Sequence, residues 1–492
     1  MVQGVTQRGD MRGIALLAAL VCLGGVPQAY GQAPPDAVAA QLRELTTLVN
    51  QMRQELADSK RESGELRQQL NAIQGELNAL RGQPAAEQLA ALQEEHELLA
   101  AKVDDQYQTK VESGSKNKVK LSGLALLTMV SSRGAVNSLD LPEFATARGP
   151  GESNGAFGAS VRQSIIGLDV EGPTFAGAKT RGEVRLDFFG GMPSEPDGVT
   201  TGFVRMRTAK LVMDWANHTL EAVQDKPFIS PLSPTSLVQT AYPALWGSGN
   251  MWAWIPQVHM THRLQATQKT KLLVQYGVMD ALTGEIPGAE YDRIPTAGER
   301  SRMPAYAFRL GAQRNGQRQA TGGLGAYYSR QNWGFNRRVD SWAMTADWDL
   351  PMGRFVSLSG ELYRGRAIGG LGGGASSTVL LSGPTSSPTT SVLAMKSGGG
   401  WAQLKYKPLQ RWEFNAVYGG DFPFRLSRPG FPSVFAAEDP RPKRNSSAFW
   451  NVIYQPRTNL LFSVEYRKLW TTQFDDLQRK ASHLSLGAGI LF

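Results

Sequence analysis

Arginines at alternate positions are the residues of this sequence whose type and spacing best suit a binding role. Arg181 and Arg185 are four residues apart, and Arg205 and Arg207 are two apart. Residues separated by an even number point to the same side of an extended strand, so each pair presents two guanidinium groups to one face. A guanidinium group is permanently charged. The spacing therefore predicts attraction of anions.

Residues that would support catalysis or hold a metal are scattered. Only five histidines occur in 492 residues. His259 and His262 are three apart, so they face opposite sides of a strand and do not share a metal. The single cysteine, Cys22, lies in the first apolar run, and the glycine-rich stretch 369–374 lacks the Lys-Ser/Thr of a phosphate-binding loop. We expect no enzymatic activity, cofactor, metal or nucleic-acid partner.

The elements that must position the arginines are short alternating segments. From Val119 to the C-terminus, apolar and polar residues alternate over segments of about ten residues. Connections after the even-numbered segments are tight, as at Asn315-Gly316, whereas those after odd-numbered segments are mostly long, as at 371–397 and 425–445. We count sixteen segments, which begin near residues 119, 161, 179, 203, 218, 255, 270, 303, 319, 339, 353, 398, 411, 446, 459 and 478.

An even number of segments, with short turns at one rim and long loops at the other, is typical of a transmembrane β-barrel. Closure of the sheet pairs every backbone group inside the hydrocarbon. Outside 14–26, no stretch approaches the ~20 apolar residues of a membrane helix, which excludes a polytopic helical protein. A soluble β-sandwich also alternates, so the strands alone do not decide the class. We predict an all-β transmembrane barrel of about 16 antiparallel strands over residues 111–492.

The last segment supports the membrane barrel. Its alternating apolar face ends on a terminal aromatic residue and resembles the sorting signal of bacterial outer-membrane barrels, which implies recognition by the barrel assembly machinery. The residues of this signal are Leu484, Leu486, Ile490 and Phe492.

Alternation also predicts which side chains face the lumen. Val184 and Leu186 face lipid, where a charge would cost roughly 2–4 kcal/mol at the midplane. The basic residues sent inward are Arg181, Arg185, Arg205, Arg207, Arg263, Arg309, Lys405, Lys407 and Arg467. Residues 111–492 carry a net charge of +13 and residues 1–110 carry −4. A water-filled tube with excess positive wall charge favours anions. Alternatively, each basic residue is paired or solvated on a polar wall, or the excess lies on outer loops near lipopolysaccharide.

The long connection 228–254 is rich in proline and aromatic residues. We expect it to fold into the bore and form a constriction, with aromatic faces along the solute path. A position over the rim or at a subunit interface remains an alternative. The candidate constriction residues are Tyr242, Trp246, Trp252 and Trp254.

The N-terminal 110 residues follow other patterns. Residues 1–31 have a positive start, a short apolar run and a small-x-small site, which predict an export signal. Over 32–110, apolar residues step by four and three from Val38 to Leu80, which predicts an α-helical coiled coil and therefore oligomerisation. A helix pair that folds back within one chain is the alternative.

The segments GEVRLDFFGG (182–191) and FVRMRTAKLVMDW (203–215) resemble early barrel strands of the DcaP-like outer-membrane porins. The resemblance implies a homotrimer, a periplasmic coil, and uptake of small anions such as dicarboxylates. Arg205 and Arg207 match the family's pore-facing pair, whereas Ile165 and Asp169 replace an inward basic residue. Phosphate-selective porins share the same layout.

We expect an outer-membrane location, with membrane lipids and lipopolysaccharide as neighbours. The alternative function is a structural tether or adhesin that joins the outer membrane to the cell wall through the coil.

Overall fold

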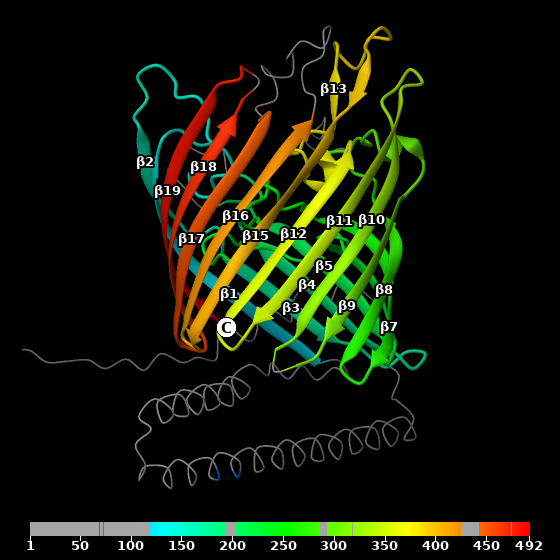
Figure 1. Cartoon of the computed structure of the whole chain (residues 1–492), viewed down its shortest axis with the longest axis vertical. Coiled ribbons are helices and arrows are strands. Elements are labelled where there is room, and N and C mark those ends of the chain that lie inside the picture. Colours follow the sequence, from blue (N-terminus) through cyan, green and yellow to red (C-terminus); the bar gives the residue numbers. More distant parts are fainter. Residues whose placement is uncertain are drawn as a thin grey trace, which may run out of the picture. The chain divides into compact units, whose positions relative to one another are not determined.

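The computed structural model describes residues 118–192, 202–285, 293–316, 318–424, 442–473 and 475–492, together with Gln68 and Ala72. Seventeen strands form one antiparallel sheet (Figure 1). They are β1 (Lys118–Arg133), β2 (Gly155–Ser160), β3 (Ile165–Glu171), β4 (Lys179–Asp187), β5 (Arg205–Asp214), β6 (His218–Asp225), β7 (Ile255–Thr267), β8 (Thr270–Met279), β9 (Ala305–Arg314), β10 (Ala320–Asn332), β11 (Arg338–Met352), β12 (Val356–Arg366), β15 (Lys396–Leu409), β16 (Trp412–Phe424), β17 (Arg444–Arg457), β18 (Leu460–Thr472) and β19 (Gln478–Leu491).

The seventeen strands occupy sixteen positions in the sheet, because β2 and β3 both pair with β1, one above the other. Each remaining strand of this sheet pairs with the next one of the sheet along the chain, including β12 with β15, and β19 pairs with β1 to close the barrel. The predicted closed barrel of sixteen antiparallel strands is therefore confirmed. The strand predicted to begin near 161 differs, because residues 161–164 interrupt it and turn the Gln163 side chain toward the interior.

Connections differ in length at the two rims, as the sequence predicts. Tight turns such as 215–217 and 458–459 lie at one end of the barrel, and long loops such as 226–254 and 367–395 begin at the other (Figure 1). The loop 367–395 contains the small hairpin β13 (Val379–Leu381) and β14 (Val392–Ala394) and the 3-10 turn η2 (Gly369–Leu371). A second 3-10 turn, η1 (Glu299–Ser301), precedes β9.

Burial in the barrel is reversed relative to a water-soluble protein. Apolar side chains on the outer face are exposed, as for Leu324 at 66% and Met344 at 61%, whereas polar side chains on the inner face, such as Gln403 and Asn451, are buried. The two kinds alternate along each strand, for example along β10 and β11. This distribution is that of a barrel whose outer wall contacts an apolar phase.

The interior contains an apolar cluster of its own. Ile229 and Met251 from the loop 226–254 pack with Ile368 and Leu371 from the loop 367–395, against the inner faces of β7–β12. A second cluster places Leu245 of the first loop against β15–β17. We call residues 226–254 the inner loop, because these contacts lie inside the barrel.

Two N-terminal predictions lie outside the described residues, namely the signal at 1–31 and, apart from Gln68 and Ala72, the coiled coil at 32–110. Gln68 and Ala72 are both helical. In the part of the chain that the structure describes, no helix is long and apolar enough to cross a membrane.

Candidate functional site

The inner loop is anchored first at β12. The carboxylate of Glu361 accepts hydrogen bonds from Ser230 Oγ at 2.7 Å and from the Leu232 backbone N–H at 2.6 Å. Thr345 on β11 donates to the carbonyl of Ile229 at 2.6 Å. A buried carboxylate that accepts two hydrogen bonds from one segment holds that segment firmly, because hydrogen bonds to a charged group are among the stronger ones.

From this anchor the inner loop follows the wall through β15, β17 and β18. The Thr235 N–H donates to Gln403 Oε1 at 2.7 Å, and Asn451 donates to the Thr235 carbonyl at 2.9 Å. Ser236 then donates to Glu465 at 2.6 Å. Inner-face polar residues that sequence reasoning left without a role are therefore hydrogen-bond partners of the inner loop, through its backbone at Thr235 and through the Ser236 side chain.

The inner loop next reaches the break between β2 and β3. Gln163 donates to the carbonyl of Val238 at 2.9 Å and accepts from the Thr240 N–H at 3.0 Å. On its return it passes β15 and β16, where Gly249 has φ +97° and an added Cβ would lie 2.1 Å from the Gly400 carbonyl oxygen. Only glycine suits this close approach.

The four predicted aromatic residues gather where the inner loop faces β5. Tyr242 stacks on Trp246 with ring centroids 5.1 Å apart, and Trp252 meets Trp254 edge to face at 4.9 Å. The guanidinium group of Arg205 lies 4.7 Å from the ring centroids of both Tyr242 and Trp254. Such cation–π contacts hold the arginine in one orientation.

Arg205 and Arg207 share one carboxylate. Arg205 binds Asp187 through two hydrogen bonds of 3.1 and 2.9 Å and donates to the Tyr242 hydroxyl at 2.8 Å. Arg207 lies 3.6 Å from the same carboxylate and donates to the Thr240 carbonyl at 2.6 Å. Its buried Nη1 has no hydrogen-bond partner among the described residues. The two arginines therefore leave one positive charge in excess of Asp187.

A β-bulge at Arg207 changes which of the following residues of β5 face inward. Arg185 pairs with Thr208 and Leu186 with Met206, so Arg207 is an extra residue without a partner on β4. After the bulge Lys210 faces inward, where it contacts Asp225 at 2.7 Å and Glu183 at 3.7 Å. Strict alternation assigns Lys210 to the opposite face from Arg205, and the sequence contains no signal for a bulge there.

Most other predicted basic residues are paired with acids on the inner face. Two pairs are almost fully buried: Arg309 with Asp347 at 2.6 Å, and Arg467 with Glu465 at 2.8 Å. We expected both arginines to line the water-filled lumen, but they do not contact open water. The inner loop and its neighbours cover them. Three pairs keep partial exposure: Arg185 with Asp169, Arg263 with Asp214, and Lys405 with Glu413. Arg181 and Lys407 are exposed near the short-turn rim.

A further arginine was missed by sequence reasoning. Arg162 lies in the break between β2 and β3, where it forms an ion pair with Asp140 at 2.5 Å and stacks over Phe189 at 3.8 Å. Phe189 in turn meets Tyr242 edge to face at 5.5 Å. Arg162 thus belongs to the same cluster as Arg205, and the predicted uninterrupted strand hid this.

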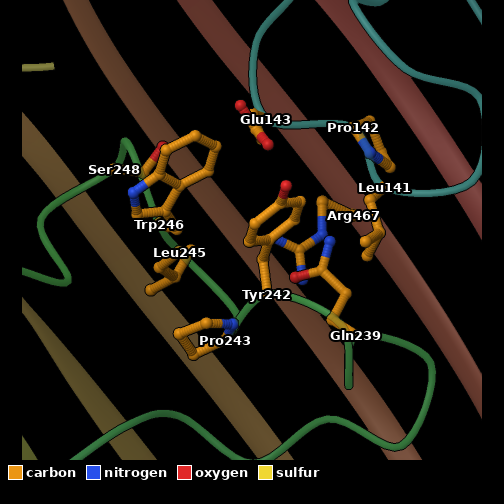
Figure 2. Close-up of a pocket in the computed structure, with 10 residues that line it drawn as sticks. All are labelled: Leu141, Pro142, Glu143, Gln239, Tyr242, Pro243, Leu245, Trp246, Ser248 and Arg467. Carbon is orange, nitrogen blue, oxygen red and sulfur yellow. The ribbon is translucent and has the colours of Figure 1, made fainter. Parts of the chain in front are cut away.

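The loop 134–154 covers the cluster from the long-loop rim. Its backbone carbonyls at Leu139 and Glu143 accept from inner-face His483 and Asn445, both at 2.8 Å. Figure 2 shows Glu143 of this loop opposite Tyr242, with Trp246 and Arg467 beside them in one small pocket. Partial enclosure of the carboxyl group raises the pKa of Glu143 to about 8.

The predicted C-terminal signal lies on the outer face. Leu484, Leu486, Ile490 and Phe492 are all exposed there. The Phe492 ring covers Gly123 of β1, where an added Cβ would lie 2.3 Å from the ring. The backbones of these two residues exchange hydrogen bonds at the barrel seam.

The prediction that His259 and His262 face opposite sides of their strand is confirmed. His259 faces inward and contacts Glu221 at 2.9 Å, whereas His262 faces outward. Across the described residues, no group of three or more His, Cys, Asp and Glu residues is placed to hold a metal ion.

No family model and no curated protein matches the sequence. Among solved structures, the chain is similar to the outer-membrane channel DcaP of Acinetobacter baumannii, with 16% identity, a TM-score of 0.57, and coverage of 78% of this chain and 100% of that chain. It also matches an anion-selective porin from Comamonas acidovorans, with 11% identity, a TM-score of 0.46, and coverage of 77% and 100%. The likeness to DcaP is one of overall structure, and the chain therefore has a DcaP-like porin fold.

Proposed function

We propose that this protein is an outer-membrane channel with a preference for small hydrophilic anions, such as dicarboxylates or phosphate. The observation that carries the anion preference is the cluster beside the inner loop, where Arg205 and Arg207 share the single carboxylate of Asp187. The buried Nη1 of Arg207 has no hydrogen-bond partner among the described residues, so the positive charge of Arg207 is only partly compensated by Asp187.

The reversed burial supports the membrane location. A belt of exposed apolar side chains would be unfavourable in water, because such large patches do not persist on soluble monomers. A lipid bilayer accepts this belt, while the inner polar face contacts the inner loop and water. We propose the outer membrane as the location, with the coil at 32–110 on the periplasmic side.

Side-chain exposure suggests where solutes pass. The inner faces of β9–β12 and β17–β19 are covered by the inner loop and the loop 367–395, and their charged pairs are almost fully buried. On β4 and β5, Arg185 and Lys210 each keep about a quarter of their side-chain surface exposed. We therefore propose a path along the wall of β3–β6, next to Arg207.

Charge along this path is not uniform. At the aromatic cluster the two arginines exceed Asp187 by one positive charge. Further down, Arg185 and Lys210 share three carboxylates and leave one negative charge; the carboxylates belong to Asp169, Glu183 and Asp225. The more enclosed of these two charge clusters dominates ion selectivity, because a charge interacts more strongly with a passing ion where the surroundings are less polar. The arginine pair, flanked by aromatic rings, is the more enclosed of the two.

The test is the zero-current potential of the purified full chain in planar bilayers under a salt gradient. We expect anion selectivity for the wild type and a shift toward cations for Arg207→Ala. The matched control is Arg330→Ala, because Arg330 forms an exposed pair with Asp340 on the outer wall, so the same charge is lost outside the lumen. A cation-selective wild type, or equal shifts in both variants, would refute the assignment.

Single-channel conductance distinguishes an open channel from the alternative function, a structural tether or adhesin. The observation that favours the tether or adhesin is that the inner loop contacts strands on most sides of the barrel, as a plug that blocks the lumen would. A tether passes no ions, whereas a channel shows discrete single-channel steps.

We further propose that the protein is a homotrimer and that the coil stabilises this trimer. Deletion of 38–103 should weaken the oligomer, as judged by cross-linking, without preventing membrane insertion, as judged by heat-modifiable gel mobility.

A further inference from the structure

Two histidines meet on the outer face at the short-turn rim. His218 is the first residue of β6, directly after the turn 215–217, and it pairs across the sheet with His262 of β7. Their Nδ1 atoms are 3.0 Å apart. The inner loop separates the two strands along the chain, so no short hairpin turn reveals this pairing in the sequence.

One ring is held in a defined orientation by a third residue. Nε2 of His262 lies 3.0 Å from the hydroxyl of Tyr276 on β8, and the two rings stack with an interplanar angle of 18°. When Nε2 carries the proton and donates it to the hydroxyl, Nδ1 has a free lone pair. Metal-binding histidines typically donate their second ring N–H to an oxygen acceptor, most often a carboxylate, a backbone carbonyl or water, which fixes both tautomer and orientation. The Tyr276 hydroxyl oxygen is placed to accept in the same way.

The spacing of the two nitrogens suits one metal ion. With both metal–nitrogen bonds at about 2.0–2.1 Å, a separation of 3.0 Å corresponds to an N–metal–N angle of about 94°. This angle is closer to the right angle of a tetragonal site than to a tetrahedral one. Tetragonal nitrogen and oxygen coordination is preferred by Cu²⁺ and Ni²⁺, and Cu²⁺ binds such ligands most strongly.

We propose that His218 and His262 form a binding site for a divalent transition metal, with Cu²⁺ preferred, on the outer face of the barrel at the short-turn rim. Water completes the coordination, since the described residues supply no third acidic, histidine or cysteine ligand there. The bound ion links β6 to β7 at the rim opposite the inner loop. Tyr276 is a positioning residue that acts through His262.

The test is Cu²⁺ titration of the purified full chain in detergent, without a histidine tag, by calorimetry and electron paramagnetic resonance. We expect one equivalent of Cu²⁺ with a spectrum of two nitrogen ligands, and weaker binding at acidic pH, because protons compete for both nitrogens. His218→Ala and His262→Ala should each abolish this signal. Tyr276→Phe should weaken binding by roughly 10- to 100-fold while retaining two nitrogen ligands.

His259→Ala is the matched control, because His259 lies on the same strand but faces the interior and contacts Glu221. It should leave the titration unchanged. Wild-type binding no tighter than that of the double variant His218→Ala/His262→Ala would overturn the proposal and leave an ordinary hydrogen bond between the rings. Loss of the signal in His259→Ala would overturn it as well. Heat-modifiable gel mobility confirms that each variant retains a folded barrel.

Discussion

Replacement of Glu361 by alanine should release the first part of the inner loop. The Glu361 carboxylate is almost fully buried and accepts hydrogen bonds from Ser230 Oγ and the Leu232 N–H, with a longer contact of 3.4 Å from Trp401 Nε1. Alanine removes both short hydrogen bonds and leaves the Leu232 N–H without its acceptor, whereas Ser230 Oγ keeps the Met251 carbonyl at 2.9 Å. The strands of β11, β12 and β15 keep their backbone pairing, so the barrel itself should remain closed.

The size of the effect follows from the number of hydrogen bonds lost. A hydrogen bond to a charged group contributes about 1.5–3 kcal/mol, so the two bonds contribute at most about 3–6 kcal/mol to docking of this segment, and Ser230 recovers part of this through the Met251 carbonyl. Relief from burying the carboxylate offsets part of this loss, which favours the lower limit. About 3 kcal/mol still corresponds to roughly a hundredfold change in the ratio of docked to undocked segment.

Single-channel recording is the assay, supported by limited proteolysis of the inner loop. Glu361→Ala should show a higher mean conductance, more open-channel noise and faster cleavage. Glu361→Gln is the conservative control: it retains an amide oxygen that accepts from the Leu232 N–H, so its effect should be clearly smaller. Conductance, noise and cleavage all unchanged in Glu361→Ala would refute the role of Glu361 as the anchor of the loop.

Three other perturbations have defined outcomes. The pKa of Glu143 is about 8 in the docked loop 134–154, against an ordinary 4.5. Docking of this loop is therefore most favourable below pH 4.5, and this stabilisation is lost progressively as pH rises through 8. Conductance should rise over this pH range in the wild type but not in Glu143→Gln. Gly249→Ala should displace the inner loop, because the new Cβ meets the Gly400 carbonyl at positive φ, and proteolysis would show it. Removal of Phe492 should reduce surface assembly, since its ring covers Gly123 at the seam; normal surface levels would argue against this.

The barrel could be predicted because its signals are local. Alternation with a period of two and the contrast between tight and long connections depend only on neighbouring residues, and they specify the number of strands and most of the inward-facing residues. The break at 161–164 and the bulge at Arg207 were missed, because each changes the side-chain direction by backbone geometry that many residue types adopt. The inward positions of Arg162 and Lys210 follow from these two irregularities.

The N-terminal patterns at 1–31 and 32–110 remain predictions from sequence. For the barrel, the sequence by itself determined the class of fold, the face that each regular residue presents, and the aromatic composition of the inner loop. Only the tertiary structure decided which charges stay near the path, which pair, and that His218 meets His262. These outcomes depend on contacts between residues tens to hundreds of positions apart, such as Ser236 with Glu465. The energy of such a pair depends on burial and distance, and neither is encoded in the spacing of residues along the chain.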